Sequence, residues 1–297
     1  MQFTKINYWQ KRVFILCWSA YTLAYLGRIN LSVAIPLMED SLALDRTSLG
    51  FVSSSFFGAY AFGQLINGRL GDKFSCKKFV FLGLFFSAIF NMLFSLTANI
   101  YLLIALWAFC GYFQSMLWGP LMKTINRWFA DEQRSKAALY MFSSVVFGFL
   151  LTWGCLGQLS SFMGWKGMFW IPSIVLLIYS FIWYFLIRNS PMEVGLNYED
   201  IKLYVKAIDK YKDKDKDKDK ELCLIDDSKI KNCKIQQDSL LKLIFRKRLY
   251  LIALASIPIG FIREGISLWS PAMLYKTFQI NLQSIMGAAL FIPLFNF

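Results

Sequence analysis

The sequence predicts an all-α fold, a polytopic transmembrane helical bundle, on three observations. Hydrophobic residues make up 57% of the 297 residues, and 29 of them are Phe. Charged residues reach only 17%, against about 25% in ordinary soluble domains. The apolar residues also form long runs, each close to the roughly 20 residues that a helix needs to cross a bilayer. A soluble core does not require this much apolar surface.

Seven hydrophobic runs are complete, and an eighth begins near residue 283. No cleavable signal peptide is evident, because the first run is too long for a signal sequence and no A-x-A-like site ends it. The first run is therefore expected to remain as a helix. The predicted spans are residues 13–37, 48–70, 79–98, 100–122, 137–160, 167–187 and 249–272.

The Lys and Arg residues predict the orientation. With the N-terminus inside, 27 of them fall in cytoplasmic segments and only Arg46, Lys166 and Lys276 fall outside. Basic residues collect on the cytoplasmic side of membrane proteins. We therefore expect a multi-pass protein of the plasma (inner) membrane, embedded in the lipid bilayer, with its N-terminus and central linker in the cytoplasm.

A long charged segment separates the sixth span from the seventh. Residues 212–220 alternate strictly between Lys and Asp, a composition too polar to form a core. We predict an N-terminal six-helix transmembrane half over 1–188, a disordered cytoplasmic linker with an amphipathic lead-in over 189–248, and the start of a C-terminal transmembrane half over 249–297. This layout is typical of duplicated 6+6 transporters, so the chain is expected to be a fragment or a truncated reading frame.

Several function classes are not expected. There is no His, and none of the six Cys forms a C-x-x-C pair, which argues against a metal site and a disulfide framework. The formal net charge of +13 sits in the gaps between spans, so it indicates topology instead of a nucleic-acid partner. Without a nucleophile–base pairing or a Gly-rich phosphate loop after a strand, neither an enzyme nor a cofactor is expected.

Two basic residues, Arg28 and Arg263, lie inside predicted spans. An Arg at the centre of a membrane helix costs about 2.5–3.5 kcal/mol on insertion scales. Such residues face a water-filled cavity and meet an anion there, and the planar guanidinium suits phosphate. Tyr21 and Tyr25 precede Arg28 by seven and three residues, so helical periodicity places all three on one face. The alternative is tyrosines packed in the bundle and an arginine snorkelling to the interface.

The surroundings of Arg263 predict a helix that can bend, because prolines and glycines flank it at Pro258, Gly260 and Pro271. Glu264 is adjacent. It is either a structural ion-pair partner or a proton-carrying group, and the structural reading is favoured.

Two loops on the predicted cytoplasmic side are expected to form a gate. The loop after the second span carries Gly68, Gly71, Asp72 and Lys73, and the loop after the fourth span carries Arg134. Small residues allow close helix approach. Asp72 can pair with a basic residue of a neighbouring loop and hold one access state closed.

With these residues in view, the chain resembles the major facilitator superfamily, since residues 68–78 match its G-x-L-G-D-K-x-x-x-K-K loop signature except at Ser75 and Cys76. Within the superfamily it looks most like the organophosphate:phosphate antiporters, the group of glycerol-3-phosphate and hexose-phosphate transporters. The segments that carry this resemblance are 25–30, 110–120 and 263–271.

The resemblance implies two pseudo-symmetric six-helix halves around a central site, acting as a functional monomer at full length. Arg28 and Arg263 would hold the phosphoryl group of a small anionic substrate, and the halves would rock as inorganic phosphate moves the other way. The positions that match the lining of that site are Tyr21, Tyr25, Tyr60, Gln64, Gln114 and Trp118.

Three departures from the family pattern bear on the substrate. Gln64 stands where glycerol-3-phosphate carriers have a Lys, Val145 or Ser144 stands near the place of their His, and Gly260 replaces a Tyr. The site is less cationic and roomier, which favours a larger phosphate ester.

Two other functions stay open. One is a proton-coupled symporter for an organic anion such as a hexuronate, with Glu264 as the titrating group; Arg263 and the segment 110–120 argue against it. The other is a transporter-like membrane sensor that binds a sugar phosphate and signals without moving it.

Overall fold

The computed structural model describes residues 2–196, 200, 203, 249–278 and 284. All the regular elements among these residues are helices, so the prediction of an all-α fold is confirmed. The chain divides into two units, residues 1–205 with 267–297, and residues 206–266. Most of the predicted linker and the predicted eighth span lie outside the described residues.

The six predicted spans of the N-terminal half correspond to helices. Two of these spans are interrupted: a short break separates α4 from α5, and a π-helical turn, η1, follows α6. The elements are α1 (Gln2–Leu42), α2 (Arg46–Lys73), α3 (Cys76–Phe94), α4 (Ile100–Gln114), α5 (Trp118–Trp128), α6 (Asp131–Leu151), η1 (Thr152–Leu156) and α7 (Gly157–Leu186).

The hairpin between the fifth and sixth spans lies within α7. Gly164 has φ 61° there, a left-handed conformation that breaks the helix in two. Glycine adopts this conformation without a steric penalty because it has no Cβ. The break reverses the chain, and the second part of α7 continues past Pro172 to Leu186.

Five stretches of helix are long and apolar enough to cross a membrane: Arg46–Lys73, Cys76–Phe94, Ile100–Trp128, Gln133–Ser160 and Phe162–Leu186. The 41-residue α1 is not among them. Arg28 and Asn30 lie near its middle and lower its mean hydropathy. The helix that carries the candidate arginine is thus not among the helices that hydropathy alone identifies as spans.

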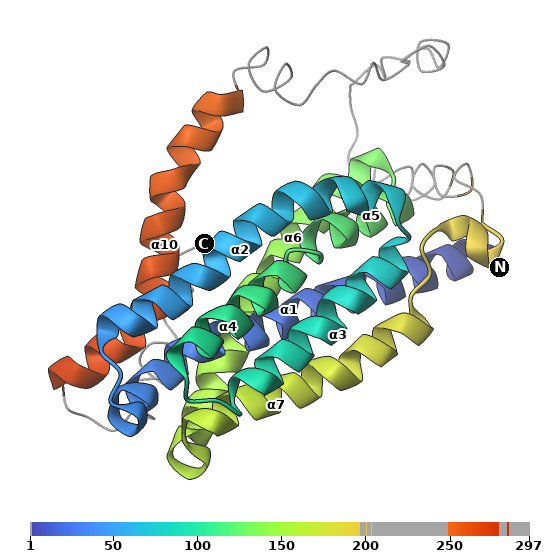
Figure 1. Cartoon of the computed structure of the whole chain (residues 1–297). Helices are drawn as coiled ribbons and strands as arrows, with labels where there is room; N and C mark the ends of the chain where they lie inside the picture. Colours follow the sequence, from blue (N-terminus) through green and yellow to red (C-terminus); the bar gives the residue numbers. More distant parts are fainter. Residues whose placement is uncertain (1, 197–199, 201–202, 204–248, 279–283, 285–297) are drawn as a thin grey trace. The chain divides into compact units, whose positions relative to one another are not determined.

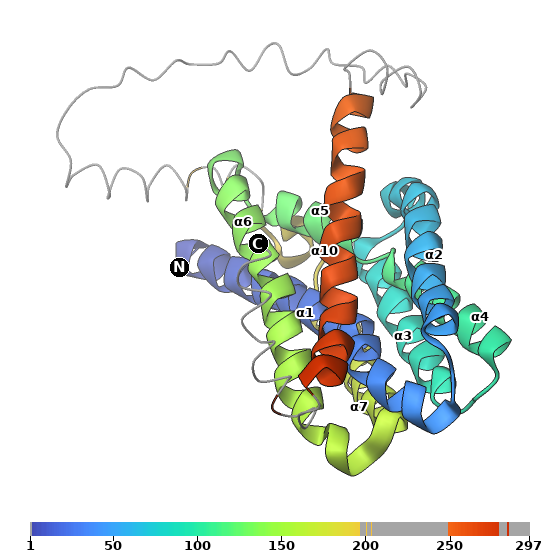
Figure 2. The ribbon, with the colours of Figure 1, turned by 90° about the vertical axis from the view of Figure 1, so that its left-hand side faces the viewer.

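In the first unit, α1 lies among the other helices of the bundle (Figures 1 and 2), and it packs against α6 and α7. α4 packs between α2 and α3, and α3 in turn packs along α7. The side chains of α1 that face the bundle are almost completely buried, including Ala20, Ala34 and Ile35 at 0% exposure. Polar residues on this helix therefore need partners within the protein.

Glycines allow these helices to approach closely. A Cβ on Gly111 of α4 would lie 2.4 Å from the carbonyl oxygen of Phe56 on α2. A Cβ on Gly148 of α6 would lie 2.4 Å from Cβ of Tyr25 on α1. Small residues at helix contacts replace the hydrophobic driving force that is missing between membrane helices. These two contacts set α2 against α4 and α6 against the Tyr25 region of α1.

Hydrogen bonds and stacked rings join the start of α1 to the ends of α5 and α7. Trp9 stacks on Trp128, with ring centroids 6.0 Å apart. Gln10 donates to the carbonyl of Trp128 at 2.8 Å, and the indole of Trp128 donates to the carbonyl of Arg188 at 3.1 Å. The Asn189 side chain then accepts hydrogen bonds from Ser75 and from the Lys77 amide. The first residues after α7 are thus fixed to the bundle.

The seventh predicted span is α10 (Leu249–Phe278), which continues as a helix beyond the predicted end at residue 272. Arg263 and Glu264 both lie in the part of α10 that belongs to the second unit.

The contact at Gly111 yields a stability prediction. Gly111→Ala should lower the free energy of unfolding by about 1–3 kcal/mol, because the added methyl would clash with backbone atoms of Phe56, which cannot change rotamer as a side chain can. Gly58→Ala is the matched control, because a Cβ there has nothing within 4 Å and alanine stabilises a helix by up to about 1 kcal/mol. Thermal unfolding of both purified variants in the same detergent would check this. Equal melting temperatures would contradict the close contact.

Candidate functional site

The guanidinium of Arg28 lies inside the bundle among aromatic rings. The residue is 8% exposed. Its Cζ atom lies 4.7 Å from the ring centroid of Tyr25, 4.5 Å from that of Tyr60 and 5.6 Å from that of Phe56. Cations within about 6 Å of an aromatic face are attracted by its negative quadrupole, more strongly where water is excluded. The rings of α1 and α2 thus stabilise the charge without neutralising it.

An uncharged amide holds one edge of the guanidinium. Nε of Arg28 donates to Oε1 of Gln114 at 3.0 Å, and Gln114 is 0% exposed. Its Nε2 group donates to the carbonyl of Gly27 at 3.3 Å. A carboxylate in this place would cancel the charge of Arg28, whereas an amide fixes its direction and leaves the charge available. Gln114, predicted to line the site, is therefore in direct contact with the predicted anion-binding group.

Aromatic side chains continue from the arginine along α1 to α5. The ring of Tyr21 lies 5.2 Å from that of Tyr25 and 4.7 Å from that of Trp118. The ring centroid of Trp118 also lies 5.3 Å from that of Phe142 on α6. Gln64 is half-buried and follows Tyr60 by one helical turn on α2, so these two predicted residues share a face.

The structure brings most of the predicted residues of the first half together. Tyr21, Tyr25, Arg28, Tyr60, Gln114 and Trp118 form a connected set of contacts from α1, α2, α4 and α5. Sequence reasoning missed Phe56. Its position one turn before Tyr60, on the same face of α2, is the signal that could have found it.

Arg263 is described within its own unit. One of its terminal nitrogens, Nη2, lies 2.9 Å from Oε1 of Glu264, and the two side chains are 43% and 22% exposed. The adjacent carboxylate thus forms an ion pair with the arginine. This environment differs from that of Arg28, which is held by a neutral amide.

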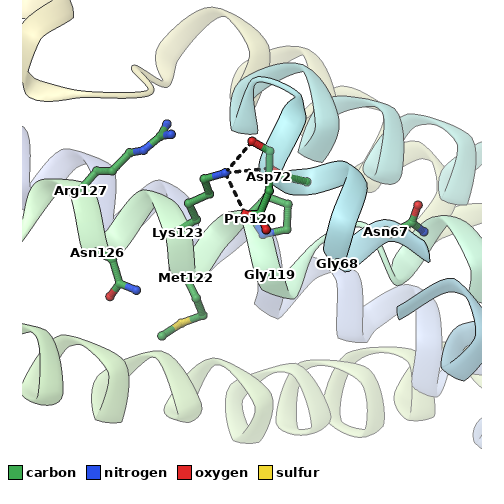
Figure 3. Close-up of a pocket in the computed structure, with 10 residues that line it drawn as sticks. Asn67, Gly68, Asp72, Gly119, Pro120, Met122, Lys123, Asn126 and Arg127 are labelled. Carbon is green, nitrogen blue, oxygen red and sulfur yellow. Dashed lines mark hydrogen bonds and ion pairs between the residues drawn. The ribbon is translucent and has the colours of Figure 1, made fainter. Parts of the chain in front are cut away.

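Three of the predicted gate residues, Gly68, Gly71 and Asp72, line a cavity of about 400 Å³ between α2 and α5 (Figure 3). Nζ of Lys123 reaches across it and donates to the carbonyl of Gly71 at 3.0 Å and to Oδ1 of Asp72 at 3.1 Å. The Asp72 side chain is 78% exposed. The residues that line the cavity are Asn67, Gly68, Gly71, Asp72, Gly119, Pro120, Met122, Lys123, Asn126 and Arg127.

Two predicted gate residues lie outside this lining. Arg134 donates through Nε to the carbonyls of Asn126 and Phe129, at 3.1 and 3.0 Å, and so braces its own loop. Lys73 is the exposed last residue of α2. Asp72 forms its ion pair with Lys123, which lies within α5 and not in a loop.

Comparison with known proteins agrees with this architecture. A family model described as Major Facilitator Superfamily matches residues 17–297. A probable hexose phosphate transport protein of Chlamydia trachomatis is 24% identical over 274 residues, covering 91% of this chain and 58% of that protein. A glycerol-3-phosphate transporter of Bacillus subtilis is 29% identical over 268 residues, covering 89% of this chain and 57% of that protein. The chain thus spans somewhat more than half the length of these relatives.

A solved structure of similar fold is the inward-facing, unoccupied form of a bacterial homologue of the human lysosomal transporter Spinster. It matches with a TM-score of 0.70 at 13% identity, over 94% of this chain and 58% of that one. This likeness concerns the fold alone. The helical bundle and its long apolar helices indicate a multi-pass membrane protein. Because the family model matches residues 17–297, this chain belongs to the major facilitator superfamily.

Proposed function

We propose that the complete protein is a secondary active transporter that exchanges a phosphorylated small molecule for inorganic phosphate by alternating access. The observation that carries this proposal is Arg28, a buried guanidinium that is oriented by the neutral side chain of Gln114 and surrounded by aromatic rings. The named relatives that carry hexose phosphate and glycerol-3-phosphate support the same class of substrate.

The orientation of Arg28 bears on how it would meet an anion. Arginine carries five N–H donors in a planar fork, and Gln114 engages the one on Nε. The other four are on the two terminal nitrogens, so a bidentate contact would be made end-on through these nitrogens. Two parallel, charge-assisted bonds to adjacent oxygens suit a phosphoryl group, and arginine keeps its charge at any physiological pH.

Arg263 is proposed as the second arginine that holds the phosphoryl group. Its bond to Glu264 favours a structural role for this carboxylate over a proton-carrying one, which weighs against the proton-coupled symporter. With Gln64 in place of a lysine, the first half offers one cation and much aromatic surface. A phosphate ester larger than glycerol-3-phosphate, such as a sugar phosphate, fits this arrangement.

Alternating access also needs contacts that break. The proposed cytoplasmic gate includes Asp72 and Lys123, whose pair is largely solvated and therefore worth no more than about 1 kcal/mol. The N-terminus and the central linker are proposed to lie on this same cytoplasmic side, as the distribution of Lys and Arg predicts.

The deciding experiment measures exchange of radiolabelled phosphate in proteoliposomes that contain the protein expressed from its full reading frame. Exchange that needs trapped phosphate or sugar phosphate, but no proton gradient, supports the proposal. Uptake of a hexuronate only under a proton gradient would replace it with the symporter and make Glu264→Gln the next variant. Binding of a sugar phosphate without any flux would point to the sensor.

We predict that Arg28→Lys and Arg263→Lys each abolish phosphate exchange, lowering it at least 100-fold, while insertion and yield are retained. Lysine keeps the charge but cannot form the bidentate fork. Arg46→Lys is the matched control, since Arg46 makes only an exposed pair with Glu39, and its exchange rate should stay within about twofold of wild type. Near-normal exchange by either test variant would remove that arginine from the site.

A second prediction concerns Gln114. Gln114→Glu should bind phosphate at least tenfold more weakly than Gln114→Met, because the carboxylate neutralises Arg28 whereas methionine only removes a hydrogen bond. Equilibrium binding of radiolabelled phosphate to both purified variants makes the comparison. Equal affinities would show that the charge next to Arg28 does not matter, in contradiction to an anion site there.

A further inference from the structure

We propose that three buried amides, Asn30, Asn91 and Gln114, form a hydrogen-bonded relay that positions the guanidinium of Arg28 for a bidentate anion. This inference rests on the proposed function, since it names positioning residues for the same site. All three side chains are 0% exposed. They come from α1, α3 and α4, and their contacts converge on the main chain directly before Arg28.

The relay centres on the carbonyl of Gly27. Nδ2 of Asn91 donates to it at 2.7 Å, and Nε2 of Gln114 donates to it at 3.3 Å. A Cβ on Gly27 would lie 3.0 Å from Nδ2 of Asn91 and 2.6 Å from Leu176. Because Gly27 has no side chain, the amide of α3 can reach the backbone of α1. The peptide preceding Arg28 is therefore fixed from two neighbouring helices.

Asn30 extends the relay to α7. Its Nδ2 group donates to Oδ1 of Asn91 at 3.0 Å and to the carbonyl of Met168 at 3.2 Å. Its Oδ1 atom accepts from the amide of Leu31 at 3.0 Å. Both ends of this amide are thus engaged within the protein.

The bonds fix the direction of each amide. Asn91 must accept from Asn30 and donate to Gly27, so its oxygen and nitrogen cannot be exchanged without losing both bonds. Gln114 likewise donates to Gly27 through Nε2 and therefore presents Oε1 to Nε of Arg28. The relay consequently determines that an acceptor, and not a donor, faces the guanidinium.

Packing alone gives no reason for this arrangement. Apolar side chains of the same size would fill the space without burying polar groups, and replacing both partners of a buried hydrogen bond by apolar groups can be nearly neutral. Another buried amide, Gln10, donates to the carbonyl of Trp128 at 2.8 Å near the start of α1. Gln10 therefore provides a matched control for the loss of a buried amide as such.

The test uses the protein expressed from its full reading frame, purified in detergent, with equilibrium binding of radiolabelled phosphate and with bromide as a competitor. Asn91→Leu should raise the Kd for phosphate about tenfold in the folded protein, whereas Gln10→Leu should change melting temperature but leave this Kd within about twofold. Bromide is spherical and does not need the fork, so its inhibition constant should be the same in Asn91→Leu as in wild type.

A double variant separates positioning from general damage. If Asn91 and Gln114 act through the same orientation of Arg28, the variant with both Asn91→Leu and Gln114→Met should bind phosphate little worse than the weaker-binding single variant. Additive losses, an unchanged Kd in Asn91→Leu, or equal losses in Gln10→Leu would overturn the relay. If Arg28→Lys itself binds phosphate normally, the proposed anion site fails instead, and this outcome is distinct from failure of the relay.

Discussion

A charged guanidinium inside an apolar helix bundle is the constraint on which the first half of this protein depends. Burial of Arg28 costs free energy, and the rings of Tyr25 and Tyr60 and the amide of Gln114 offset part of that cost. Aromatic faces and an amide oxygen are favourable to a cation but leave its net charge unchanged. Much of the polar character of α1 follows from this requirement, including Asn30 and the tyrosines that precede the arginine.

The site and the gate differ in the persistence of their contacts. The bonds around Arg28 join residues that are between 0% and 8% exposed, where an unmade hydrogen bond is costly. The Asp72–Lys123 pair at the other end of α2 includes a carboxylate that is 78% exposed, where water readily replaces either partner. Under the proposed function, such a bundle would keep the geometry around Arg28 while the contacts of the proposed gate exchange, as alternating access requires.

The sequence predicted the spans, the all-α fold and the face that joins Tyr21, Tyr25 and Arg28, because these depend on run length and helical period alone. It did not predict the break between α4 and α5, the π-helical turn or the left-handed Gly164, because such local departures from α-helical geometry leave the apolar run unchanged. Asn91 was also missed. A lone asparagine in an apolar run has no local pattern, and its role is visible only once α3 lies against Gly27.

The two proposed arginines have different electrostatic surroundings, and this difference has a consequence for exchange. Gln114, a neutral amide, accepts from Nε of Arg28, whereas the Glu264 carboxylate lies 2.9 Å from a terminal nitrogen of Arg263. Under the proposed function, an anion would meet a neutral amide beside Arg28 but would compete with a carboxylate for Arg263. Binding to the first half would be favourable by itself, and engagement of the second half would require phosphate to displace or share the Glu264 contact. A doubly charged phosphoryl group competes for that arginine better than a singly charged carboxylate does, which favours phosphate esters over hexuronates as the substrate.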